Sequence, residues 1–310
     1  EQISTSYYED LIQKYLLDNT HASIVMICPK KGLTAEADQK LHQKLQDYKA
    51  GLAREEVEKL VQDTKDLRAY QEEPTPPEIL EKIPVLKVSD ISEDIAPIYN
   101  EEQKAGDVPC ICHPIDTNGI GYLTLIFDLR TLSEKEIPYA GLLQAVLGII
   151  DTEHYEYGKL FNEINRRTGG IETSLEMYTD VTKVKEKEFR PTFEIKTKAM
   201  YGQLPFALSM MEEILMRSVL TDEKRIKEIL DMLKSRLQMK FLSAGHSSAA
   251  LRAMSYSSPL ARFKDMTNGI EYYETVSRIA DHFEEEKDRL MEMLQTISRK
   301  VFRKDRMIVS

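Results

Sequence analysis

Residues 171–178, IETSLEMY, decide the fold class of this 310-residue chain. Apolar Ile171, Leu175 and Met177 recur at every second or fourth position, with polar residues between them. Residues 193–199 show the same alternation. Because successive side chains of a strand point to opposite faces, a period of two is typical of half-buried strands. We therefore expect these two segments to be strands of an antiparallel sheet.

Two further segments with strand character precede this pair. Residues 108–114 and 120–127 read as strands and flank Asp116-Thr117-Asn118-Gly119. That turn is of the Asn-Gly type, which is typical of a β-hairpin. Residues 306–310 read as the beginning of a last strand.

Helices fill most of the remaining sequence. Ser133 and Glu136 form a capping box, and the almost wholly apolar residues 139–150 behind it predict a helix that is buried on most sides. A second helix carries Tyr157, Leu160, Phe161 and Ile164 on one face, and Gly169-Gly170 ends it. Further helices are predicted at 204–218, 222–243, 247–254 and 271–300. Their methionines are expected to fill the core, namely Met210, Met211, Met216, Met232 and Met239. Strands and helices in this order predict an α+β layer sandwich.

The first third of the chain has a different character. Residues 2–18 have helical spacing, and residues 22–28 are short and β-rich and predict a strand that ends at Pro29. Thr34 is the expected N-cap of a helical hairpin that extends to about residue 70 and is polar on its outer face.

A linker separates this region from the sheet-forming part. Residues 72–77, EEPTPP, have linker composition, and residues 83–107 look extended and loop-like. We expect a boundary near residue 95, with a helical-hairpin linker region at 1–95 and a non-catalytic α+β peptidase-like domain at 96–310. The final strand, cut off by the end of the chain, indicates that this domain is truncated at its C-terminus.

Composition excludes several classes of protein. The net charge of −10 is the reverse of the basic excess that nucleic-acid binders show. The longest apolar run, around residues 142–150, is far shorter than the roughly 20 residues of a membrane span. The polar N-terminus, Glu1-Gln2-Ile3, shows no signal peptide. Three cysteines are too few and too uneven for a disulfide scaffold. The cysteine content therefore indicates a reducing compartment, which is the cytoplasm, or an organelle matrix if the source is a eukaryote.

No set of residues forms a complete catalytic, cofactor or metal site. The histidines lack both H-E-x-x-H and its inverse, and His154 follows Glu153 but has Ile150 where a second histidine would be needed. Cys110 and Cys112 form a C-x-C beside His113, without the second pair that a zinc site requires. We therefore predict no catalytic, cofactor-binding or metal-ligating residue in this chain.

An ordered set of short segments resembles one family. Residues 15–21 (YLLDNTH) and 86–91 (LKVSDI) are similar to the linker region of insulinase/pitrilysin-type zinc metallopeptidases, in their presequence-protease branch. Residues 169–171 (GGI), 245–249 (GHSSA) and 269–273 (GIEYY) resemble the third homologous domain of that branch. The resemblance spans nearly the whole chain.

The resemblance implies an architecture and the loss of a site. Enzymes of this family have four related α+β domains in two halves, joined by the helical linker. The first domain binds zinc through H-x-x-E-H on a buried helix. Aligning Asp151-Thr152 with the family's Gly-Thr places that motif at residues 142–146. Leu142, Ala145 and Val146 then stand where the two histidines and the glutamate would be. The family also positions substrate with an Arg and a Tyr of its fourth domain, which we expect outside this chain.

The expected function follows from the resemblance. The chain would be the non-catalytic half-fragment of a zinc-dependent, peptide-degrading endopeptidase, forming the wall and hinge of its closed substrate chamber. Zinc would belong to the parent enzyme. The partners would be the catalytic half of the same polypeptide and unfolded peptides, not nucleic acid or a membrane. The alternative is a stand-alone structural or binding subunit with a catalytically dead peptidase-like fold. A self-sufficient hydrolase would need a site that the sequence does not show.

Overall fold

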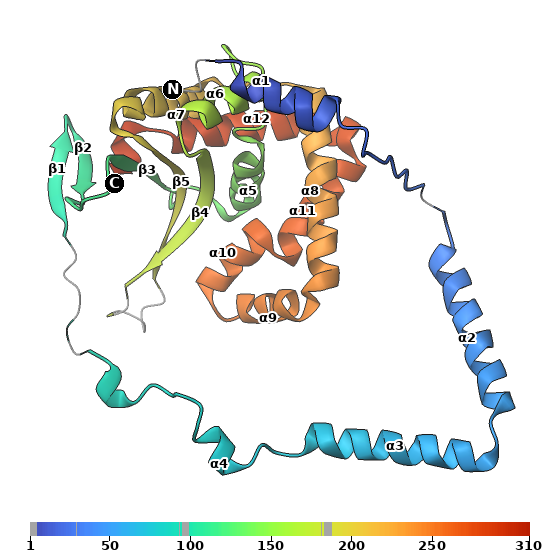
Figure 1. Cartoon of the computed structure of the whole chain (residues 1–310). Helices are drawn as coiled ribbons and strands as arrows, with labels where there is room; N and C mark the ends of the chain where they lie inside the picture. Colours follow the sequence, from blue (N-terminus) through green and yellow to red (C-terminus); the bar gives the residue numbers. More distant parts are fainter. Residues whose placement is uncertain (1–4, 29, 93, 95–98, 181, 183–187) are drawn as a thin grey trace. The chain divides into compact units, whose positions relative to one another are not determined.

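The computed structural model describes residues 5–28, 30–92, 94, 99–180, 182 and 188–310 (Figure 1). The chain divides into two compact units, residues 1–94 and residues 95–310. The domain boundary predicted near residue 95 and the strand end predicted at Pro29 lie outside the described residues.

The second unit is built on one sheet with the strand order β1-β2-β6-β3-β5-β4. All neighbouring strands are antiparallel except β2 and β6, which are parallel. The α+β fold class is therefore confirmed. The strands are β1 (Glu101–Ala105), β2 (Val108–Cys112), β3 (Ile120–Asp128), β4 (Ile171–Thr179), β5 (Phe189–Met200) and β6 (Met307–Val309).

The two segments with alternating polarity are β4 and β5, and they pair with each other. Their register runs from Ile171 opposite Thr197 to Thr179 opposite Phe189. Leu125, Phe193 and Ile195 lie on the sheet face that the helices cover, and each is at most 7% exposed. Burial of this apolar face explains why the period of two identifies the strands correctly.

The predicted hairpin between residues 108 and 127 is wrong. Asn118 and Gly119 do form a local turn with positive φ angles of 51° and 81°. However, β6 lies between the two strands, with Val309 opposite both Cys110 and Leu125. The strand from the far end of the chain thus takes the place of a direct hairpin partner. The second neighbour of β2 is β1. Its residues, EEQKA, are polar and exposed, so the sequence of β1 is typical of a loop.

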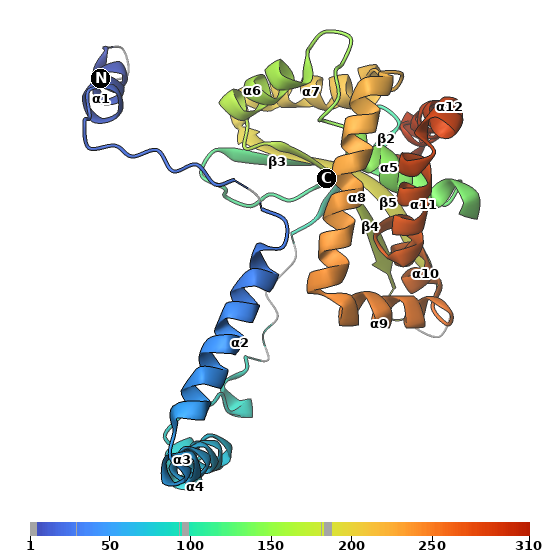
Figure 2. The same cartoon turned by 90° about the vertical axis from the view of Figure 1, so that its right-hand side faces the viewer.

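Helices cover one face of the sheet and continue beyond it. They are α5 (Ile137–Val146), α6 (Tyr157–Arg167), α7 (Leu204–Arg217), α8 (Glu223–Ser243), α9 (Gly245–Ser255), α10 (Pro259–Asn268), α11 (Ile270–Asp281) and α12 (Phe283–Val301). Figure 2 shows α8 running past the sheet to α9, with α10 and α11 returning beside it. The predicted capping box is confirmed, because Glu136 accepts a hydrogen bond of 2.7 Å from the backbone N–H of Ser133.

Two expectations about the helices are wrong. The helix predicted at 271–300 is two helices, because His282 leaves the helical conformation (φ −117°, ψ 39°) between α11 and α12. The preceding α10 was not predicted. Of the methionines assigned to the core, Met210 and Met211 are buried. The other three are more than half exposed, because they lie on the outer faces of α7 and α8, namely Met216, Met232 and Met239.

The first unit contains helices with little buried surface. They are α1 (Tyr7–Ile12), continued by a π-helical turn (Gln13–Leu17), α2 (Leu33–Gly51), α3 (Arg54–Glu72) and the short α4 (Pro77–Leu80). The helix predicted at 2–18 is thus shorter than expected. The N-cap of α2 is Gly32, with a φ of +84°, and not Thr34, because the left-handed turn there starts the helix earlier.

The segment predicted as a strand at 22–28 forms no strand among the described residues. Ile24, Val25, Met26 and Ile27 are 80–95% exposed, and no described strand pairs with this segment. A strand requires a neighbour that accepts its backbone hydrogen bonds, so composition alone does not form one. The exposed apolar side chains of this segment are hereafter called the Ile24–Ile27 stripe.

Candidate functional site

Helix α5 carries the residues at which the family resemblance places the zinc motif. Leu142 and Val146 are each 1% exposed and belong to the hydrophobic core. Gln144 and Ala145 are half-buried and face a cavity. The helix therefore presents a carboxamide and a methyl group to this cavity, and neither can ligate zinc or act as a general base.

The other residues considered for metal binding lie on β2 or directly after it. Cys110 and Cys112 lie on β2, and the ring of His113 contacts the hydroxyl of Ser310 at 3.1 Å and the carbonyl of Tyr99 at 3.2 Å. Among the residues that the structure describes, no group of three or more His, Cys, Asp or Glu side chains could hold a metal ion.

His154 has a structural contact. Its Nδ1 lies 3.0 Å from Oε2 of Glu213, a side chain that is 7% exposed on α7. Burial raises the pKa of Glu213, but hydrogen bonds from Thr152 and His154 outweigh burial and hold that pKa below its ordinary value. Since the imidazole itself is 59% exposed, His154 is a surface residue, and its contact attaches the loop after α5 to α7.

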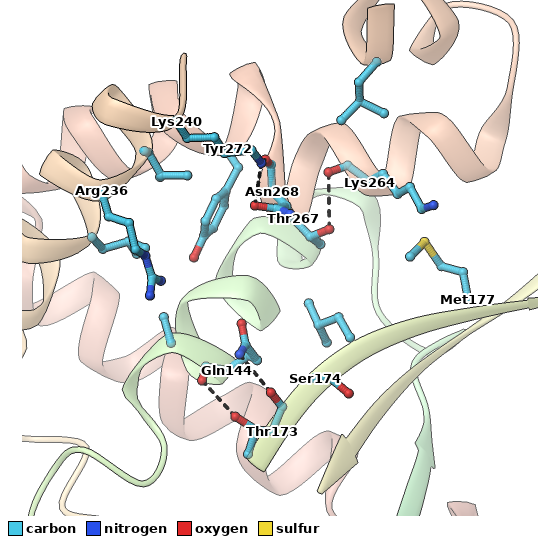
Figure 3. Close-up of a pocket in the computed structure, with 15 residues that line it drawn as sticks. Gln144, Thr173, Ser174, Met177, Arg236, Lys240, Lys264, Thr267, Asn268 and Tyr272 are labelled. Atoms are coloured by element: carbon cyan, nitrogen blue, oxygen red, sulfur yellow. Dashed lines mark hydrogen bonds between the residues drawn. The ribbon is translucent and has the colours of Figure 1, made fainter. Parts of the chain in front are cut away.

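A cavity of about 510 Å³ lies between β4, α5, α8, α9 and α10 (Figure 3). Its size is within the range of ligand pockets. Thr173, Leu175 and Met177 of β4 form one wall, and Gln144 lies at one end. We call this space the β4 cavity.

Gln144 fixes the end of the cavity to the edge of the sheet. Its Nε2 donates to the backbone carbonyl of Thr173 at 3.0 Å, and the Thr173 hydroxyl donates to the carbonyl of Gln144 at 3.1 Å. This reciprocal pair attaches α5 to β4. It also shows that the carbonyl of Thr173 points away from β5.

Three cations line the β4 cavity, and none of its described lining residues is acidic. Arg236 and Lys240 lie one turn apart on α8, and Lys264 comes from α10. Lys240 donates to the carbonyl of Asn268 at 2.8 Å and to its Oδ1 at 3.0 Å, and both acceptors are neutral. Burial lowers the pKa of Lys240. Among the described residues, no carboxylate forms an ion pair with these three side chains, so the cavity is electropositive.

A tyrosine hydroxyl also lines this cavity. Tyr272 is 3% exposed, and its ring packs against α5 beside Gly141. Figure 3 shows its hydroxyl directed toward the space between Arg236 and Gln144. Burial raises the pKa of this hydroxyl above its ordinary range, while the charge of Arg236 acts in the opposite direction. No hydrogen bond to a described residue engages this oxygen, which is not one of the fully buried unpaired atoms and so stays accessible from the cavity.

The corner between α10 and α11 holds Tyr272 in place. Asp265 is fully buried, accepts a bond of 2.6 Å from Arg252 and accepts the backbone N–H of Ile270 at 2.9 Å. A Cβ on Gly269 would lie 2.3 Å from Oδ1 of Asp265, so the close approach requires glycine. Gly269 and Tyr272 both belong to a segment, residues 269–273, on which the family resemblance rests.

The sequence alone does not identify the lining of this cavity. Arg236 and Lys240 are spaced i, i+4, which places them on one face of α8. That spacing is a usable signal, but charged side chains on a helix usually form a solvated face. The lining contains cations, amides and hydroxyls, without a nucleophile paired to a base. Its chemistry is that of binding a polar, negatively charged chain.

Comparisons with known proteins identify the relatives of this chain. The family model described as Peptidase M16 (subfamily C) associated matches residues 27–279. Protein HypA of Clostridium perfringens is 32% identical over 308 residues, which are 99% of this chain and 31% of that protein. Presequence protease 1, chloroplastic/mitochondrial, of Arabidopsis thaliana is 25% identical over all of this chain and 28% of its own length. The mitochondrial presequence protease of Yarrowia lipolytica is 26% identical over 94% of this chain and 29% of its own length. This chain thus spans less than a third of the length of these relatives.

Proposed function

This chain belongs to the Peptidase M16 (subfamily C) associated family, and from that membership we propose that it is the non-catalytic part of a zinc-dependent, peptide-degrading endopeptidase. In this proposal it forms the wall and hinge of the chamber that encloses the substrate. The observation that carries the proposal is the match to presequence proteases over nearly the whole chain, combined with Leu142, Ala145 and Val146 at the position of the zinc motif.

The zinc of the parent enzyme would be bound by its catalytic half. Histidine and carboxylate ligands are needed for a catalytic zinc that activates water. The buried face of α5 supplies Leu142 and Val146 instead, both in the core. This chain would contribute shape and substrate contacts while the other half contributes the reaction.

The first unit would connect the two halves. Leu41, Leu45 and Tyr48 lie on one stripe of α2 and are each more than half exposed. Such a stripe is typical of a helix that packs against another element. We propose that residues 1–95 form the linker, residues 96–310 form the third homologous domain, and the proline-rich segment around Pro74–Pro77 is the pivot between them.

The proposed location is the cytoplasm, or an organelle matrix if the parent is eukaryotic. Two of the relatives are named as mitochondrial or as chloroplastic and mitochondrial proteins, which supports the second setting. In the part of the chain that the structure describes, no helix has the length and apolarity needed to cross a bilayer.

A reconstitution experiment tests the proposal. The parent polypeptide should cleave a fluorogenic peptide, and a zinc chelator should abolish the cleavage. The catalytic half mixed with this chain should associate weakly, because intramolecular interfaces of this kind are typically about 600–1,500 Å². Activity should appear only when the remaining domain is added as well. Chelator-sensitive cleavage by this chain alone would refute the proposal, and so would full activity of the catalytic half with this chain alone.

A further inference from the structure

Strand β4 leaves one side of its backbone available. It is the last strand in the sheet order, and β5 is its one neighbour among the described strands. The carbonyl of Thr173 points away from β5, toward Gln144. Because backbone groups of successive residues alternate sides in an antiparallel strand, the N–H and C=O groups of Leu175 and Met177 also point to this outer edge. An edge of this kind is a template for a further strand.

The positive charge of the β4 cavity determines which side chains an added strand could carry. The side chains of an added strand would alternate, so every second one would point toward α8 and α10. There it would meet Arg236, Lys240 and Lys264, whose charges no described carboxylate neutralises. Complementary charge both attracts a ligand and excludes ligands of the wrong sign.

The hydroxyl of Tyr272 is a second, independent observation at the same place. The residue is 3% exposed, and its hydroxyl has no described hydrogen-bond partner. A hydroxyl donates readily to a carboxylate, and hydrogen bonds to charged groups are the stronger kind. The cavity therefore contains a donor that no described residue engages and that an acceptor on a ligand could reach.

We propose that the β4 cavity binds an extended peptide carrying acidic side chains, which adds to the outer edge of β4 as an antiparallel or parallel strand. Main-chain hydrogen bonds to Leu175 and Met177 would hold the peptide, and Arg236, Lys264 and Tyr272 would select carboxylates on its helix-facing side. The proposal rests on the proposed function only in that substrate peptides are the chains that would reach this cavity. It assigns this part of the protein an active role in holding substrate.

The test uses the whole chain and a short fluorescein-labelled peptide of alternating valine and glutamate residues, blocked at both ends. Fluorescence anisotropy compares it with a matched peptide that has lysine in place of glutamate. We expect the glutamate peptide to bind at least about ten-fold more tightly. Added salt should weaken this binding, because salt screens partly exposed charges. N-methylation removes the N–H donors that strand pairing requires. Methylating the amides on the edge of the peptide that pairs with β4 should abolish binding, and methylating those on its other edge should not.

Variants of the protein locate the contact. Arg236→Glu and Lys264→Glu should each weaken binding of the glutamate peptide by about ten-fold. Lys224→Glu is the matched control, since Lys224 is exposed on α8 away from the cavity, and it should leave the affinity unchanged. Tyr272→Phe keeps the ring packed and removes only the hydroxyl, and it should weaken binding about ten-fold. Hydrogen exchange should slow at Ile171–Thr179 when the peptide binds.

Several results would overturn the proposal. Equal affinity for the two peptides would do so, as would unchanged affinity in both charge-reversal variants. Protection of β1 in place of β4 would show that the peptide adds to the opposite edge of the sheet. If the parent protein cleaves no peptide but the glutamate peptide binds to this chain as expected, the proposed function is contradicted and this inference stands. If the parent protein cleaves peptides but the glutamate peptide does not bind to this chain, the inference fails and the proposed function stands.

Discussion

Replacing Leu142 with alanine tests whether α5 is core structure or the wall of a working site. Leu142 is 1% exposed within the main hydrophobic cluster. The change removes three carbons, worth roughly 0.8 kcal/mol each in transfer free energy, or about 2.4 kcal/mol together. Incomplete collapse of the cavity adds to this, and measured Leu→Ala losses are about 2–5 kcal/mol. We expect a loss of about 3 kcal/mol in the free energy of unfolding.

The assay is denaturant unfolding followed by circular dichroism, with Leu242→Ala as the matched control. Leu242 is 88% exposed on α8, so the same chemical change should cost less than about 0.5 kcal/mol there. In thermal unfolding, a loss of about 3 kcal/mol corresponds to roughly 6–12 °C for a unit of this size. Equal and small losses in the two variants would show that α5 is not packed as described, and the placement of the lost motif on it would fail.

Metal content, pH dependence and glycine packing give three more tests. The chain purified without chelators or added metal should contain far less than one zinc per molecule by elemental analysis, and one tightly held zinc would refute the assignment of zinc to the other half. Burial raises the pKa of Glu136, but hydrogen bonds from Lys300 and Ser133 outweigh burial and hold that pKa below its ordinary value of 4.5. A lowered folded-state pKa stabilises the fold above the ordinary value, so Glu136→Gln should be destabilising at neutral pH, and its difference from the unchanged protein should shrink as pH falls below 4.5. A Cβ on Gly141 would lie 2.9 Å from the Tyr272 ring, so Gly141→Ala should cost roughly 1–3 kcal/mol. Gly158→Ala, with open space around it, should be neutral or slightly stabilising in the same unfolding assay.

Local sequence pattern predicts those elements whose identity depends on one buried face. The alternation in residues 171–178 identifies β4 because that strand buries one face against helices. The apolar run at 139–150 predicts a buried helix because α5 packs against several neighbours, although the helix itself ends at Val146. The capping box at Ser133 depends on atoms only three residues apart, so it too is visible in the sequence.

Strand pairings that depend on distant partners cannot be predicted in this way. The turn at Asn118-Gly119 forms as expected, but β6 joins the sheet from the far end of the chain and takes the place of the hairpin partner. The strand expected at residues 22–28 fails for the related reason that no described strand pairs with it. Strand pairing is a property of the whole chain, and the pattern of a single segment cannot specify it.

The lining of the β4 cavity cannot be predicted from the sequence for the same reason. Lys264 and Arg236 lie on different helices, and only the fold places both in the lining of one cavity. Each residue alone is an ordinary surface charge. Tyr272 is a typical core aromatic in the sequence, and only the folded structure places its side chain in the lining of the cavity.

The Ile24–Ile27 stripe has a consequence for the behaviour of the chain in solution. It is a short, uncharged, β-branched segment without proline, and its backbone is not paired to any described strand. Such segments pair readily with copies of themselves, which is the first step of ordered aggregation. When expressed alone, the chain therefore carries a self-association hazard in this segment of its first unit. A lysine at Val25 would act as a gatekeeper and keep concentrated solutions clear, while leaving residues 99–310 untouched.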